Sequence, residues 1–269
     1  MTSPARQAAP LRADCIADSA GGLTFDVATP GDAGVAHLLL RRRDADDEVS
    51  LPLAPAAEGR LRAALPSTVA LPEGRWDAYA RVADDEPHRL VPGVTDLRSL
   101  ADRIPSGLHG HVAVRIPYAT RQGNLTVRSW LRAPHAEAAE LRAGETGLSV
   151  RGRVYGVELG PGAHAELHGR PGTGARGTRR LDLTGERTEF RLAVAYAGLP
   201  PGVWDLWLRP AGPGGPRVRV ARLLDDVADK QPVFTFPSAR VQTPAGAVVA
   251  GPYYTQDNDL SVSVTALRP

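Results

Sequence analysis

The chain has 269 residues, of which 42% are hydrophobic, and a formal charge of +2. This length supplies enough apolar side chains for two domains, and the near-neutral charge argues against nucleic acid as a partner. The 28 Gly and 24 Pro residues interrupt the sequence so often that long helices are disfavoured and short strands joined by turns are favoured.

Cysteine content and hydropathy narrow the class of protein further. Cys15 is the only cysteine, so the chain has no intrachain disulfide. No apolar stretch approaches the length of a membrane-spanning helix, and residues 1–10 lack the apolar segment of a secretion signal. We therefore expect a cytoplasmic protein without a membrane span.

Taken in chain order, the predicted elements are almost all strands. Residues 1–12 are expected to be a flexible tail and residues 13–133 a first β domain. Residues 134–140 are Ala-rich and are expected to form a linker or a short helix, and residues 141–269 a second β domain. Alternating apolar and polar residues predict strands at 23–27, 35–40, 75–82, 112–116, 124–128, 148–154, 163–167, 188–195, 204–208, 217–223 and 260–264.

Two motifs occur once in each predicted domain, in the same order. LPEGRWD at 71–77 returns as LPPGVWD at 199–205, and PYATRQGNLTV at 117–127 returns as PYYTQDNDLSV at 252–262. Self-similarity at such a long period is typical of a duplicated folding unit. The pattern predicts an all-β protein with two tandem immunoglobulin-like β-sandwich domains related by an internal repeat.

The motif residues have structural roles in this interpretation. Trp76 and Trp204 are expected in the two cores, each in the strand that follows a Pro/Gly turn. Asp77 and Asp205 alternate with them, so they are expected to point outward or to bind the N–H groups of a neighbouring loop, together with Arg81 and Arg209.

His109 and His111 are the strongest candidates for chemistry, because two His residues at i and i+2 of a strand point to the same side. No third ligand stands at a diagnostic spacing, so we expect no metal and no cofactor. If the chain is an enzyme, we expect His109, His111, Arg115 and Tyr118 to line a pocket at the seam between the domains.

Tyrosines of the repeated hairpin are the candidates for binding. Tyr118 and Tyr253 occupy the same repeat position and are expected to pack, with their hydroxyl groups tied to a neighbouring loop. Tyr254 replaces Ala119 of the first copy, so it is expected to be exposed and to contact a ligand or a partner. Arg121 is expected to bind an anionic polymer or the carboxylates of a partner.

The paired LPxGxWD and PYxT motifs resemble the β-sandwich accessory domains that follow the catalytic domain in some bacterial cell-wall glycosyltransferases and teichoic-acid-type polymerases. The resemblance implies a non-catalytic module for assembly or for binding a glycan or an anionic wall polymer. A homo-oligomer or a glycosyltransferase would then be its partner. The alternative is a stand-alone enzyme or accessory subunit of small-molecule biosynthesis, because the chain contains no transferase domain pattern.

Overall fold

The computed structural model of the chain describes residues 10–28, 34–83, 85–101, 103, 110–243 and 246–267. These residues form an all-β protein, as the sequence predicts, and the α-helix found among them is one turn, α1 (Arg98–Ala101). None of the helices in this described part is long and apolar enough to cross a membrane. The chain divides into unit 1 (Met1–Ile104, Ala113–Leu131 and Leu224–Ala228) and unit 2 (Pro105–Val112, Arg132–Leu223 and Asp229–Pro269).

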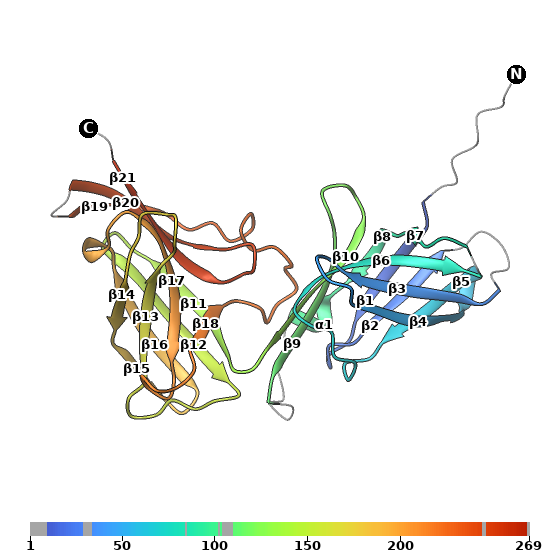
Figure 1. Cartoon of the computed structure of the whole chain (residues 1–269), viewed down its shortest axis with the longest axis horizontal. Coiled ribbons are helices and arrows are strands. Elements are labelled where there is room, and N and C mark those ends of the chain that lie inside the picture. Colours follow the sequence, from blue (N-terminus) through green and yellow to red (C-terminus); the bar gives the residue numbers. More distant parts are fainter. Residues whose placement is uncertain are drawn as a thin grey trace, which may run out of the picture. The chain divides into compact units, whose positions relative to one another are not determined.

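Strands of unit 1 follow the order β8-β1-β2-β5-β4-β3-β6-β10-β9, with β7 paired to β6 (Figure 1). Strand β4 pairs with β3 and, through Ala54 and Pro55, with β5, so it joins the two faces of the unit. The strands are β1 (Arg12–Ala17), β2 (Leu23–Ala28), β3 (Ala36–Arg42), β4 (Glu48–Pro55), β5 (Arg60–Leu65), β6 (Gly74–Val82), β7 (His88–Arg89), β8 (Val91–Asp96), β9 (Val112–Ala119) and β10 (Leu125–Arg132), and the 3-10 turn η1 spans Ala57–Gly59.

In unit 2 the strand order is β15-β16-β12-β11-β18-β17-β21-β20-β19, with β13 paired to both β14 and β17 (Figure 1). The strands are β11 (His135–Ala143), β12 (Gly147–Tyr155), β13 (His164–Gly169), β14 (Thr178–Leu181), β15 (Leu183–Glu186), β16 (Glu189–Ala195), β17 (Gly202–Arg209), β18 (Val218–Ala221), β19 (Ala239–Thr243), β20 (Gly246–Tyr254) and β21 (Leu260–Ala266), and the 3-10 turn η2 spans Tyr196–Gly198.

The two units share one pairing scheme. Strand β1 pairs with β2 antiparallel and with β8 parallel, and β11 likewise pairs with β12 antiparallel and with β18 parallel. The single strand β4 of unit 1 corresponds to two strands of unit 2, with β14 paired to β13 and β15 paired to β16. Asp182 separates these two strands. The repeated motifs therefore lie in units of matching topology.

A continuous strand path distinguishes these units from the expected sandwiches. Unit 1 is a nearly closed barrel rather than two clearly separate immunoglobulin-like sheets. The physical reason is that β4 is paired along both edges, so the two faces remain connected by hydrogen bonds.

Each core is anchored by the Trp of its motif. Trp76 and Trp204 are 1% and 0% exposed. Their indole nitrogens donate hydrogen bonds to the carbonyl groups of Pro72 and Pro200, at 3.0 and 2.9 Å. The Pro that turns the chain therefore also supplies the acceptor that a buried indole needs.

One expected element is corrected by the structure. Most of the expected linker at 134–140 lies in β11, whose residues His135, Ala136, Glu137 and Ala138 are buried. The Ala-rich composition suggested a linker, but small side chains also fit a strand that is paired on both edges. Of the expected tail, residues 1–9 lie outside the described residues, and β1 begins at Arg12.

Candidate functional site

Three of the four residues proposed for an enzyme lie within the described residues, at or just before β9. His109 lies outside the described residues, and His111 is half-buried just before β9. Arg115 is buried, and its guanidinium donates to the carbonyl groups of Pro66 and Val69. Burial and the nearby charge of Arg103 lower the pKa of Arg115. Arg115 and Tyr118 are three residues apart on β9, so their side chains leave opposite faces of the strand.

Tyr254 occupies the core of unit 2, contrary to the expectation that it is exposed. It is fully buried, and its ring lies 5.9 and 6.0 Å from the rings of Phe234 and Phe236. Strand β20 alternates, and its other core-facing side chains are those of Val248, Ala250 and Pro252. The side chain of Tyr253 therefore points away from the core, on the outward face of β20, where it is partly exposed beside Ser261. Arg121 is exposed in the turn between β9 and β10, and Tyr118 is half-buried.

Asp77 and Asp205 point outward, but their partners differ from the expected Arg81 and Arg209. Asp77 accepts hydrogen bonds from Arg43, Arg89 and Thr126. Burial opposes its ionisation, and the hydrogen bonds from Arg43 and Thr126 outweigh burial and lower its pKa. Arg81 lies four residues after Asp77 on the same outward face of β6, beyond this cluster.

In unit 2 the corresponding carboxylate, Asp205, accepts hydrogen bonds from Arg170 and Ser261 and forms an ion pair with Arg219 at 2.8 Å. Burial opposes its ionisation, but hydrogen bonds from the two Arg residues lower the pKa of Asp205 to about 2. Arg209 instead binds Glu166 at 3.2 Å. The partners come from segments far away in sequence, which the spacing within one strand did not reveal.

The cross-strand register places one set of side chains on the outward face of unit 2. Residues directly opposite each other in antiparallel strands point to the same side of the sheet. A first row contains Arg180, Glu166, Trp207 and Arg219. The next row contains Thr178, His168, Asp205, Ser261 and Tyr253, and a third contains His164 and Arg209. We call these residues, with Arg170 and Arg217 whose side chains contact them, the Trp207 face.

Trp207 lies at the centre of this face and is partly exposed. The guanidinium groups of Arg217 and Arg219 lie 5.3 and 5.0 Å from its ring centre, and the His168 ring meets it edge-on at 6.2 Å. Such contacts are favourable, because the electron-rich face of an indole attracts cations. The ring therefore holds cationic groups at a fixed place on the surface.

A hollow of about 730 Å³ adjoins Trp207 and is lined by residues that include Arg132, Arg170, Tyr253 and Gln256. Arg132 binds the Asp259 carboxylate at 2.7 Å, and Arg219 lies 3.4 Å from the same group. Burial raises the pKa of Asp259, although both Arg residues act in the opposite direction. The Trp207 face and this hollow were missed in the sequence, because Trp207 is not part of the repeated motif.

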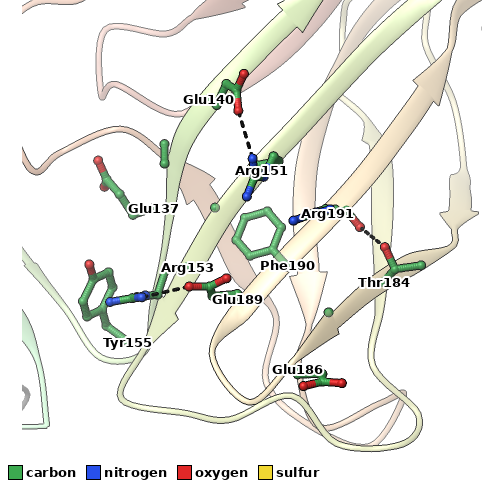
Figure 2. Close-up of a pocket in the computed structure, with 13 residues that line it drawn as sticks. Glu137, Glu140, Arg151, Arg153, Tyr155, Thr184, Glu186, Glu189, Phe190 and Arg191 are labelled. Atoms are coloured by element: carbon green, nitrogen blue, oxygen red, sulfur yellow. Dashed lines mark hydrogen bonds and ion pairs between the residues drawn. The ribbon is translucent and has the colours of Figure 1, made fainter.

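A second hollow, of about 710 Å³, lies over β11, β12, β15 and β16. Figure 2 shows Arg151 pointing toward Glu140 and Arg153 pointing toward Glu189, at 3.5 and 3.0 Å. These exposed charges pair across neighbouring strands. Phe190 is 1% exposed, so its ring is not available to a ligand. We interpret this surface as a solvated sheet face with balanced charge.

The single thiol and the clustered His and acidic side chains are the other groups that could carry chemistry. Cys15 is buried, and burial followed by the charges of Asp14 and Asp26 raises its pKa to about 12, so its thiol stays protonated. Among the residues that the structure describes, no three or more His, Cys, Asp or Glu side chains are placed to hold a metal ion. His164 and His168 both contact Glu166, which Arg209 also binds.

No family model matches this chain, and no curated protein matches it either. Among solved structures, it is distantly similar to residues 217–571 of S. aureus TarS, with a TM-score of 0.40 and 15% identity over 72% of this chain and 45% of that chain. A pullulanase from Anoxybacillus sp. LM18-11, solved in complex with maltotriose, aligns with a TM-score of 0.27 and 9% identity over 73% of this chain and 24% of that chain. The chain thus spans less than half of the length of each.

Proposed function

We propose that this chain is a non-catalytic binding module whose ligand is a hydroxyl-rich, anionic chain such as a charged glycan or a polyol-phosphate wall polymer. The supporting observation is the Trp207 face. Its guanidinium groups are those of Arg170, Arg180, Arg209, Arg217 and Arg219, and its carboxylates are those of Glu166 and Asp205. Five positive groups against two negative ones leave a net positive surface around a partly exposed indole.

The charge surplus supports an anionic rather than a neutral ligand. A neutral sugar needs donors and acceptors in similar numbers, whereas excess guanidinium groups favour phosphate, sulfate or carboxylate groups. Adding the groups of the adjoining hollow, Arg132 against Asp257 and Asp259, leaves the positive surplus in place. The indole, the Tyr253 ring and the polar side chains Thr255 and Gln256 suit the hydroxylated parts of such a ligand.

A binding role also fits the protonation states of this face. Asp205, with a pKa of about 2, remains a carboxylate at neutral pH and acts as a fixed acceptor for its Arg partners rather than as a proton donor. The sequence resemblance to accessory domains of wall glycosyltransferases points to the same role. In this proposal the partner enzyme is a glycosyltransferase that acts on the bound polymer.

Calorimetry with dextran sulfate tests the proposal, with uncharged dextran as the matched ligand. We expect the wild type to bind dextran sulfate more tightly than dextran, and the affinity to fall as salt rises. Trp207→Ala and Arg217→Gln should each weaken binding by about tenfold, the effect of losing one central contact. Arg187→Gln is the control, because Arg187 is exposed on the turn between β15 and β16.

Two results would contradict the proposal. The first is a wild type that binds neither polymer, and the second is a Trp207→Ala protein that is folded and binds as the wild type does. Sedimentation of the same variants examines the alternative role in assembly. If Trp207→Ala dissociates an oligomer without changing polymer binding, the Trp207 face is an interface between copies of the chain.

A further inference from the structure

Tyr79 of unit 1 is held between two guanidinium groups in the same way as Trp207 of unit 2. Arg41 and Arg89 lie 5.2 and 5.0 Å from the centre of the Tyr79 ring. For Trp207 the corresponding distances, to Arg217 and Arg219, are 5.3 and 5.0 Å. Both rings are partly exposed on the outward face of their sheet.

The second cation of each pair comes from a different place in the fold. In unit 1, Arg41 lies opposite Asp77, and in unit 2 the equivalent position opposite Asp205 is occupied by His168. In unit 2 the second cation is instead Arg217, from the segment before β18. Tyr79 lies opposite Arg89 and Trp207 lies opposite Arg219, so duplication of the folding unit accounts for the ring and for one of its cations. It does not account for the second cation, because Arg41 and Arg217 occupy non-equivalent positions. The second cation is therefore the feature to be explained by binding.

A hollow of about 730 Å³ lies along this face of unit 1. It is lined by residues that include Val35, His37, Arg41, Arg81, Asp85 and Glu86. Arg41 thus contributes both to the cation pair on Tyr79 and to the wall of the hollow. An aromatic ring, a fixed cation and an adjoining hollow occur together here, as they do at Trp207.

We infer that unit 1 carries a second, weaker site for the same class of ligand, a hydroxyl-rich anionic chain, centred on Tyr79. This inference rests on the proposed function of the Trp207 face. The site contains the guanidinium groups of Arg41, Arg43, Arg81 and Arg89 against the carboxylates of Glu48 and Asp77, and Asp85 and Glu86 stand at the hollow. Asp85 and Glu86 cancel the positive surplus of this face, whereas the Trp207 face keeps its surplus when its hollow is included. The anionic groups of the ligand are therefore held by the cations fixed on Tyr79 rather than by net charge, which makes binding weaker and less sensitive to salt.

The test is the binding stoichiometry of a sulfated tetrasaccharide, a probe short enough to occupy one face at a time. We expect two sites on the wild type, the second about fivefold weaker, which is the effect of one exposed ion pair. Trp207→Ala should abolish the tighter site, so that only the weaker site remains. Arg41→Ala and Tyr79→Ala should each abolish the weaker site, so that only the tighter site remains. Arg41 is exposed, so its variant is expected to fold normally.

Arg98→Ala is the matched control in unit 1, because Arg98 is an exposed Arg paired with a carboxylate, as Arg41 is. Loss of the weaker site in Arg41→Ala but not in Arg98→Ala supports the inference. If one site is found, and it is abolished by Trp207→Ala and unchanged by Arg41→Ala, the second site is wrong while the proposed function stands. Equal losses in Arg41→Ala and Arg98→Ala would show general attraction between charges and also overturn it. A wild type that does not bind overturns the proposed function itself.

Discussion

Arg170 holds the carboxylate of Asp205 with two hydrogen bonds, from Nη2 to Oδ1 at 2.6 Å and from Nε to Oδ2 at 3.2 Å. This bidentate geometry fixes both side chains, and Arg219 adds an ion pair at 2.8 Å. The side chain of Asp205 is 16% exposed. The contact is therefore a salt bridge that is largely shielded from solvent, at one edge of the Trp207 face.

The first prediction follows from the pKa of about 2 for Asp205 in the folded protein, against an ordinary value of 3.8. A lowered pKa means that the ionised group stabilises the fold above about pH 4, and that this contribution is lost as the pH falls toward 2. Asp205→Asn should reduce the free energy of unfolding at pH 6 by on the order of 1 kcal/mol, after allowance for solvent screening. Urea unfolding at pH 6 and pH 2.5 should show the difference from wild type shrinking; an equal difference at both would contradict it.

The second prediction separates the adjacent tyrosines. Tyr254→Ala should lower the free energy of unfolding by about 3–5 kcal/mol, because it leaves a cavity between Phe234 and Phe236 in the core. Tyr253→Ala removes a side chain from the outward face and should cost less than about 1 kcal/mol. Chemical unfolding of the two variants measures both values. A Tyr253 variant that is the less stable of the two would show that the faces of β20 are reversed.

The third prediction concerns the glycine of the LPxGxWD motif. Gly202 has a φ of +133°, and a Cβ atom there would lie 2.2 Å from the backbone nitrogen of Ala175. At Gly74 the nearest atom is Nε of Arg42, at 2.8 Å, in a flexible side chain that is able to move. Gly202→Ala should therefore cost about 2 kcal/mol or more, and Gly74→Ala less than about 1 kcal/mol. Equal melting temperatures for the two variants would refute this difference.

The fourth prediction uses the single cysteine. Because the buried Cys15 thiol has a pKa of about 12, very little thiolate forms at pH 8. Iodoacetamide should label the native protein far more slowly than the protein unfolded in urea. Mass spectrometry after timed labelling measures both rates. Rapid labelling under native conditions would mean that β1 is open to solvent.

Period-two alternation predicted many strands because it is local information. Each predicted strand overlaps an observed one, including 75–82 within β6 and 204–208 within β17. Alternation did not predict that residues 135–143 form β11, and it also missed β1, β4, β5, β7, β8, β14, β15, β19 and β20. The segment that became β11 is Ala-rich and has no clear alternation, so its pairing with β12 and β18 arises from contacts with residues distant in sequence.

The candidate site was less accessible from the sequence than the fold. Asp77 and Asp205 were placed on the outward face, but their partners were sought four residues away on the same strand. The partners Arg43 and Arg170 lie 34 and 35 residues before them. Trp207 was not singled out at all, because its importance depends on the Arg and His side chains that two other segments bring to its ring.

The sequence by itself determined the duplication, the all-β class and the turns that precede Trp76 and Trp204, because turn residues and alternation act over a few neighbouring positions. Only the tertiary structure decided which face of β20 is the core. Alternation divides the side chains of a strand into those of one face and those of the other, and a shift of one residue in the pairing register exchanges the two faces. The register of β20 with β21 therefore decides which of Tyr253 and Tyr254 is buried. The same registers, set by contacts between distant strands, gather the Arg residues around Trp207 and Tyr79.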